Sequence, residues 1–284
     1  MNIAHVIYKM PVHTAGGDAS PDTIKAYVRN ARHFVNWIEA RAKTPDTATP
    51  EDARDYVFAC YQQGSKRDTV NQRIAGARAF YRTAIAIGEF TGDNPFDYVK
   101  GKISDPDAAQ TRYYTPEEVQ KIYDTCQTPR DRAIILLMAV EGLRTIEITR
   151  LKVQHVDFKN ARIFIHGKGN HDAYIYPAEK TLDTLNTVIG TATTGEIFRN
   201  ELDGSPLTRD GIRYIVNSIL RRAGLKKNGN SCHALRHSCG TNLYAATKDI
   251  RLVQETLRHQ SPQVTARYSH VVNRKNATSI ITPA

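Results

Sequence analysis

A stretch without helical or strand periodicity divides the chain, and this division constrains the fold most. Residues 99–112 contain Gly, Pro and mixed charges with no repeating apolar position, which is typical of a linker between domains. The 284 residues also correspond to two domains at roughly 150 residues each. We therefore expect a first domain over residues 20–98, preceded by a flexible arm over residues 1–19, and a second domain after the linker.

The first domain has the patterns of a small helical bundle. Apolar residues recur at helical spacing in segments that end near Ile38, Gln63 and Ile87. Ser20 or Asp22 can cap the first helix, and Thr49 followed by a proline caps the second. The expected helices cover about residues 20–38, 50–63 and 68–87.

The chain after the linker combines helices with a small sheet. Thr115 and Glu118 form a capping box, and the apolar run over residues 133–140 predicts a buried helix. Short β-branched or aromatic segments separated by turn residues predict antiparallel strands over residues 153–158, 162–166 and 173–176. Further helices are expected over residues 181–189, 208–223, 234–246 and 250–257, and in a piece that holds Tyr268. The fold class is therefore mainly α with a small antiparallel β-sheet.

The charge is unevenly distributed. The formal net charge is +10, and residues 106–284 carry 25 Lys and Arg against 17 Asp and Glu. Such an excess suits a polyanionic partner, although a merely soluble basic protein would show it too. The first residues do not resemble a signal peptide, and no run approaches the roughly 18 apolar residues of a membrane span. We expect a cytoplasmic protein that does not contact membranes.

Four motifs follow one another in the second part of the chain. They are Gly142-Leu143-Arg144 with Glu147, Gly167-Lys168-Gly169, His233-Ala234-Leu235-Arg236-His237, and Leu257-Arg258-His259 with Tyr268 nine residues later. Their order and spacing resemble the catalytic domain of the tyrosine recombinases, the phage-integrase family. The resemblance covers about residues 113–270, and residues 20–98 resemble the family's helical, SAM-like core-binding domain.

The resemblance implies site-specific DNA recombination through a 3′-phosphotyrosyl intermediate. Tyr268 would be the nucleophile. Arg144 and Arg236 would clamp the nonbridging phosphate oxygens, because guanidinium groups are permanently charged and present paired donors. The chain has 14 tyrosines and 39 cations, so only the family pattern selects these three.

The same resemblance assigns the remaining catalytic roles. His233 would accept the tyrosine proton or hold its hydroxyl, and His259 would bond a phosphate oxygen. Lys168 would protonate the departing 5′ oxygen. Glu147, one helical turn after Arg144, is either an orienter of that arginine or an exposed helix acid.

The chain departs from the family pattern at several places. Arg258 stands where a glycine normally precedes the second histidine. His171 and Ala173 replace basic residues after the Gly-Lys-Gly turn, and Ala246-Thr247 replace a usual glycine. These changes affect the expected loop geometry more than the expected chemistry.

A zinc site is the alternative for one of these motifs. Cys232, His233, His237 and Cys239 include two histidines at i and i+4 with flanking thiols. The two cysteines are seven residues apart and would lie on different helix faces, so we expect buried thiols in a reducing compartment and no metal.

Candidate DNA contacts follow the charges. Lys66, Arg67, Asn71 and Arg73 on the third helix, and Arg209 with Arg213 at a helix start, either enter a groove or form solvated charged faces. The family resemblance implies double-stranded recombination sites with inverted repeats, a homotetramer coupled by the tail over residues 271–284, and no cofactor. Which accessory proteins take part stays open.

The short N-terminal arm leaves no room for the arm-binding domain of larger phage integrases. This favours simple Cre-like or Xer-like recombinases, including resolvases carried by transposons. A type IB topoisomerase-like enzyme and a non-catalytic DNA-binding relative are the alternatives.

Overall fold

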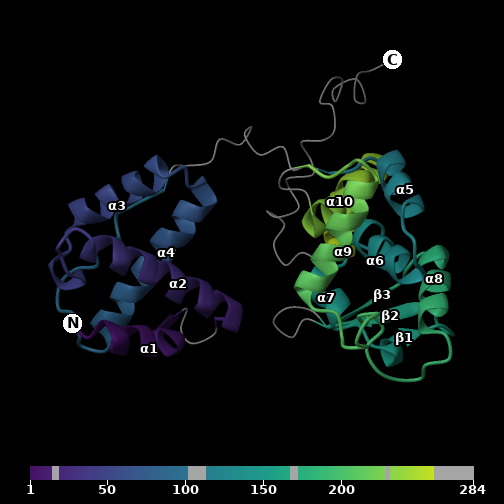
Figure 1. The fold of residues 1–284 in the computed structure, drawn as a ribbon, viewed down its shortest axis with the longest axis horizontal. Helices are drawn as coiled ribbons and strands as arrows, with labels where there is room; N and C mark the ends of the chain where they lie inside the picture. The colour runs from purple at the N-terminus through teal and green to yellow at the C-terminus, as the bar shows by residue number, and fades with distance from the viewer. Residues whose placement is uncertain (15–18, 102–112, 167–171, 228–230, 259–284) are drawn as a thin grey trace, which may run out of the picture. The chain divides into compact units, whose positions relative to one another are not determined.

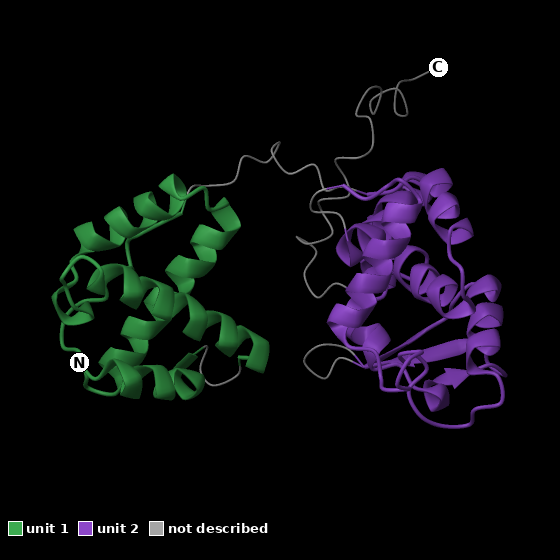
Figure 2. Cartoon of the chain, in the orientation of Figure 1, with its two compact units in different colours: residues 1–109 green, residues 110–284 purple. Residues whose placement is uncertain are grey.

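The protein is mainly helical and divides into two compact units. The computed structural model describes residues 1–14, 19–101, 113–166, 172–227 and 231–258. Unit 1 comprises Met1–Ala109 and unit 2 comprises Gln110–Ala284 (Figure 2). The described residues contain many helices and one small antiparallel sheet (Figure 1), which confirms the predicted fold class. Most of the expected linker, residues 102–112, lies outside the described residues.

Unit 1 is a helical bundle. Its helices are α1 (Ile3–His13), α2 (Pro21–Glu39), α3 (Pro50–Gln62) and α4 (Arg67–Ala86), with a 3₁₀ turn at Pro45–Thr47. The three helices expected from the sequence lie within about one residue of their predicted bounds. Ser20 caps α2 by accepting a hydrogen bond from the Thr23 amide at 3.3 Å, and Thr49 caps α3 in the same way.

The prediction of a flexible arm over residues 1–19 is wrong for residues 3–13, and residues 15–18 lie outside the described residues. Residues 3–13 form α1, whose Val6 and Met10 are 0% exposed and pack into the core of unit 1 against α2 and α4. Asn2 caps the helix by accepting from the His5 amide at 3.0 Å. Pro11 lies in the last turn, where it removes one backbone donor without breaking the preceding turns.

An aromatic cluster fills the centre of unit 1. Phe34 of α2 makes edge-to-face contacts with Tyr56 of α3 and with Phe96, at centroid distances of 5.2 Å and 4.8 Å. The Arg78 guanidinium of α4 donates to the Phe96 carbonyl at 2.8 Å and so holds the end of the unit against the bundle.

Unit 2 is built around α6 (Pro129–Ala139). The other elements are α5 (Pro116–Asp124), α7 (Thr145–Thr149), α8 (Glu179–Ile189), α9 (Arg209–Arg222), α10 (Cys232–Thr247), α11 (Ile250–Leu257), a 3₁₀ turn at Val153–His155, and strands β1 (Val156–Asp157), β2 (Arg162–Ile165) and β3 (Ala173–Ile175). The helix α6 packs against α5, α7, α8, α9 and α10. Its residues 133–139 are all buried, which explains why the sequence shows a continuous apolar run there.

The sheet is antiparallel in the order β1-β2-β3. Ile163 of β2 pairs with Val156 on one side and with Ile175 on the other, and Ile163 and Ile165 are buried in the core. The expected strand over residues 153–158 is only partly correct, because residues 153–155 form a 3₁₀ turn and only residues 156–157 pair with β2. β-branched residues alone therefore did not determine a strand there.

A residue near the start of unit 2, Tyr114, is bonded to α10. The Tyr114 amide donates to Ser238 Oγ at 2.7 Å, and the Tyr114 carbonyl accepts from Asn242 Nδ2 at 3.1 Å. Immediately afterwards Thr115 caps α5 with the predicted box, in which the Glu118 amide donates to Thr115 Oγ1 at 3.3 Å. Among the described residues, no helix has the length and apolar character needed to cross a membrane.

Burial of α1 leads to a stability prediction. Met10→Ala should lower the free energy of unfolding by about 2–5 kcal/mol, because it leaves a cavity in the core of unit 1. Val12→Ala on the same helix, at a side chain that is 65% exposed, is the control and should change it by less than about 0.5 kcal/mol. Urea unfolding measures both. Equal, small effects would show that α1 does not contribute to the core.

Candidate active site

Arg144 lies at the start of α7 and is held by Glu147 one turn later. The Arg144 backbone amide donates to Glu147 Oε2 and the Arg144 Nη1 donates to Glu147 Oε1, both at 2.8 Å. The other terminal nitrogen, Nη2, points to the Arg258 carbonyl at 3.5 Å. The Arg144 side chain remains 32% exposed, so the carboxylate orients a guanidinium that solvent or a ligand can still reach.

Arg236 reaches the same place from α10. It is 6% exposed, and its two terminal nitrogens donate to the carbonyls of Gly142 and Leu257. Gly142 precedes α7 and Leu257 ends α11. The two arginines therefore face the successive carbonyls of residues 257 and 258, which brings together sequence motifs more than 90 residues apart.

Glu147 is the buried acid of this group. Its side chain is 1% exposed, and Arg258 Nη2 donates to Oε2 at 2.9 Å. Burial raises the pKa of Glu147, but Arg258, the Arg144 amide and the Arg144 guanidinium together outweigh burial and hold the pKa below its ordinary 4.5. The carboxylate is therefore an orienter and not an exposed helix acid.

Gly142 allows these segments to approach one another. Its φ of +65° lies in the left-handed region that favours glycine. A Cβ there would lie 2.6 Å from Leu257 Cδ2 and 3.1 Å from Cys239 Sγ. Glycine is thus required both by the backbone angle and by the closeness of α10 and α11.

His233 lies on the exposed side of α10, in the helix that carries Arg236. Its ring centroid is 6.2 Å from that of His237. Cys232 and Cys239 are buried, and the Cys239 thiol donates to the Val140 carbonyl at 3.0 Å. Within the described ranges, no three or more His, Cys, Asp or Glu side chains gather in a way that could hold a metal ion.

The other predicted catalytic residues fall outside the described residues. Lys168 lies in sequence between β2 and β3, where His166 Nδ1 and Asp172 Oδ1 are 3.3 Å apart. His259 and Tyr268 follow the last described residue, Arg258, and the tail over residues 271–284 is also outside. The structure therefore brings Arg144 and Arg236 together. The positions of Lys168, His259 and Tyr268 remain predictions.

The candidate DNA contacts lie in both units. In unit 1, Lys66 and Asn71 are exposed, Arg67 pairs with Asp68 at 3.0 Å, and Arg73 donates to Ser65 Oγ at 2.9 Å.

In unit 2, Arg209 and Arg213 are exposed in the first turns of α9, and Arg213 pairs with Asp210 at 2.8 Å. Local ion pairs are also typical of a solvated charged face, and a role of either set in DNA binding remains a prediction.

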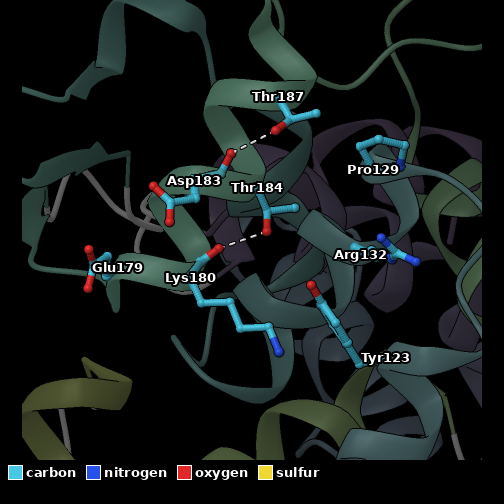
Figure 3. A pocket seen from close by; sticks show the side chains of 8 residues that line it. All are labelled: Tyr123, Pro129, Arg132, Glu179, Lys180, Asp183, Thr184 and Thr187. Atoms are coloured by element: carbon cyan, nitrogen blue, oxygen red, sulfur yellow. Dashed lines mark hydrogen bonds between the residues drawn. The ribbon is translucent and has the colours of Figure 1, made fainter.

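A shallow pocket of about 420 Å³ lies elsewhere on unit 2, between α5, α6 and α8 (Figure 3). The Tyr123 ring lies between two cations, with Lys180 Nζ at 4.0 Å and the Arg132 guanidinium carbon at 5.6 Å from its centroid. The pocket shares no lining residue with the arginine cluster, which consists of Arg144, Glu147, Arg236 and Arg258.

The sequence did not predict the contacts that Arg258 and Gly142 make at this site. The available signal for Arg258 was its departure from the usual glycine, which marked a loop change and did not indicate which acid its side chain would contact. For Gly142, the motif Gly-Leu-Arg indicates a function only for its arginine.

Two family models match the chain. The model described as phage integrase family matches residues 112–275, and the model described as phage integrase, N-terminal SAM-like domain, matches residues 17–88. The first match covers more than half of the chain and includes the arginine cluster.

Relatives match over nearly the full length. The chain is 30% identical over 269 residues to tyrosine recombinase XerC of Lacticaseibacillus casei (strain BL23), with 89% of each chain covered. It is 27% identical over 266 residues to tyrosine recombinase XerC of Staphylococcus epidermidis (strain ATCC 12228 / FDA PCI 1200), with 89% of this chain and 88% of that protein covered.

Solved structures share the fold at low identity. The Tn1549 transposon integrase in complex with a circular intermediate DNA aligns with a TM-score of 0.77 at 17% identity, over 99% of both chains. XerH recombinase bound to a palindromic difH substrate aligns with a TM-score of 0.71 at 17% identity, over 98% of this chain and 93% of that one.

The crowding at Gly142 leads to a prediction. Gly142→Ala should lose about 1–3 kcal/mol of unfolding free energy beyond what Gly224→Ala loses, because the added methyl overlaps Leu257. Gly224 is the control, since its φ of +70° carries the same backbone cost of about 1–2 kcal/mol with nothing within 4 Å of an added Cβ. Chemical denaturation of both variants measures the difference, and equal losses would contradict it.

The buried carboxylate leads to a second prediction. Because the folded protein lowers the pKa of Glu147 from 4.5, its ionised form stabilises the fold above pH 4.5, and this contribution is lost as the pH falls through the lower folded value. Glu147→Gln should therefore cost on the order of 3 kcal/mol at pH 7, and the gap to wild type should narrow below pH 4.5. Urea unfolding between pH 7 and pH 3 tests this. The exposed Glu255→Gln on α11 is the control, and a gap that does not depend on pH would exclude the assignment.

Proposed function

The chain belongs to the phage integrase family, and on that basis we propose that it is a tyrosine site-specific recombinase, which cuts DNA strands and rejoins them to new ends. Family matches in both units and relatives named tyrosine recombinase over 89% of the chain support this assignment. The low-identity structures support the fold only.

The geometry that supports the chemistry best is the meeting of Arg144 and Arg236. Attack on a phosphodiester builds additional negative charge on the nonbridging oxygens, and fixed guanidinium donors stabilise that charge without reorganising. Arg236 is fixed by two backbone carbonyls and Arg144 by Glu147. Two oriented cations at one point are what such a transition state requires.

We assign the nucleophile to Tyr268. Its phenolic oxygen attacks the phosphorus, a 3′-phosphotyrosyl bond forms, and the bond from phosphorus to the 5′ oxygen breaks. His233 accepts the phenol proton or holds the hydroxyl, and Lys168 gives a proton to the departing 5′ oxygen. His259 donates to a phosphate oxygen.

Rejoining is the same reaction in reverse. The 5′ hydroxyl of another strand attacks the phosphotyrosyl bond, and Tyr268 leaves as a phenol. The phosphodiester energy is retained in the intermediate, so the exchange needs no external energy source.

The assembly extends the same proposal. We expect four copies on two recombination sites with inverted repeats, with residues 271–284 docking on a neighbouring copy, and Lys66, Arg67, Asn71, Arg73, Arg209 and Arg213 contacting DNA. The relatives named tyrosine recombinase XerC support a simple Xer-like recombinase, and a transposon resolvase is the second candidate. Because the substrate is DNA, we expect it to act in the cytoplasm.

A nicked suicide substrate tests the function. A binding site is first selected from random-sequence duplexes with the wild-type protein, and nicked versions are then incubated with the enzyme. Wild type should form a covalent 3′ adduct and Tyr268→Phe should form none. Arg144→Ala should slow adduct formation by about 10²–10³-fold, as for the loss of one oriented donor.

Tyr98→Phe is the matched control, because Tyr98 is 91% exposed in unit 1 and should leave adduct formation unchanged. An undiminished adduct with Tyr268→Phe would refute the nucleophile. Products from a supercoiled plasmid with two sites separate recombination from relaxation, since only recombination rearranges the flanking sequences.

A further inference from the structure

Arg258 has an unfavourable backbone conformation for a side-chain-bearing residue. It ends α11 with a φ of +51°, in the left-handed region where a residue with a Cβ is strained by about 1–2 kcal/mol. Glycine would avoid this strain. An arginine there carries this cost, which contacts of its side chain can offset.

The side chain makes such contacts and is largely buried, at 15% exposure. Arg258 Nη2 donates to Glu147 Oε2 at 2.9 Å, and Nη1 donates to the Thr256 carbonyl at 3.0 Å. The first contact crosses 111 positions of sequence and joins the end of α11 to α7. The second contact fixes the guanidinium against its own helix end.

These contacts close a ring with Arg144. Glu147 Oε1 accepts a hydrogen bond from Arg144 Nη1. Glu147 Oε2 accepts hydrogen bonds from the Arg144 amide and from Arg258 Nη2. Arg144 Nη2 in turn points to the Arg258 carbonyl at 3.5 Å. Without Arg258, one oxygen of a nearly fully buried carboxylate would keep only the Arg144 amide, and the carboxylate could rotate toward the Arg144 guanidinium.

The charges favour the same conclusion. Within the ring, the Glu147 carboxylate faces two guanidinium groups, so these three residues carry a net charge of +1 and Arg144 is not fully neutralised. The Glu141 carboxyl also interacts with Arg258, but burial raises its pKa and so disfavours its charged form. A pair of Arg144 and Glu147 alone would be neutral. The additional cation thus keeps positive potential beside Arg144, where the proposed reaction needs it.

We propose that Arg258 is a positioning residue for Arg144, which acts by sharing the Glu147 carboxylate and by presenting its own carbonyl to the Arg144 guanidinium. The proposal rests on the proposed recombinase function. Arg258 itself need not touch the DNA.

Arg258→Gly is the informative variant, because glycine adopts the positive φ and only the side chain is lost. Lys248→Gly is the matched control. Lys248 ends α10 with a φ of +57°, is an exposed cation, and contacts the Ala245 carbonyl and no carboxylate among the described residues. Both variants remove one positive charge and one left-handed side chain from the same unit.

The measurement is the rate of adduct formation on the suicide substrate at saturating protein, together with DNA affinity. Arg258→Gly should lower the rate of adduct formation about 10–100-fold. Its Kd for the duplex should stay within about threefold of the wild-type value. Lys248→Gly should retain the wild-type rate, and Arg258→Lys should restore part of it. An unchanged rate in Arg258→Gly, or a rate loss matched by an equal loss of affinity, would overturn the positioning role.

A readout without DNA separates this proposal from the recombinase function. The pKa of Glu147, followed by the ¹³C shift of its labelled carboxyl, should rise in Arg258→Gly and stay unchanged in Lys248→Gly. If wild type forms no adduct but the carboxyl titration shifts as expected, the recombinase proposal fails while the ring of contacts stands. If the titration does not shift, the ring does not exist in solution and the positioning role falls.

Discussion

The site depends first on the buried guanidinium of Arg236. A buried cation is costly unless its donors are satisfied, and here neutral backbone carbonyls at Gly142 and Leu257 satisfy them. These bonds join α10 to the segment before α7 and to the end of α11. These two acceptors are neutral carbonyls, so the contact fixes the cation in place without itself cancelling the charge. Arg144 complements it, since it shares one carboxylate with Arg258.

Local signals in the sequence predicted most of the fold. Ser20, Thr49 and Thr115 cap helices where expected, since a side-chain oxygen before a helix satisfies amides that have no other local acceptor. The sequence does not predict the first helix, because its apolar stretch is short and is interrupted by Lys9 and Pro11. Its burial depends on α2 and α4, which a local pattern does not contain. The expectation of a strand at residues 153–155 was wrong for a similar reason. Whether such a segment forms a turn or a strand depends on its pairing partners, which lie elsewhere in the chain.

The candidate site was only partly accessible from the sequence. The family pattern selected Arg144 and Arg236 among 39 cations, and the structure places both against neighbouring carbonyls. The sequence could not predict the burial of Glu147, because this depends on how α7 packs. It could not predict the contact from Arg258 either, because this contact crosses 111 positions. The need for Gly142 likewise arises from Leu257 and Cys239, which lie on other helices.

The entry of the chain into unit 2 has a mechanical consequence. Tyr114 is bonded through its amide to Ser238 and through its carbonyl to Asn242, both on α10. A pull on the chain before this residue therefore loads α10 directly, and α10 is the helix that carries His233 and Arg236. Tension on the chain before Tyr114 would reach the charged groups through two hydrogen bonds and one rigid helix, and it would also act on the core of unit 2, in which the Tyr114 side chain is buried.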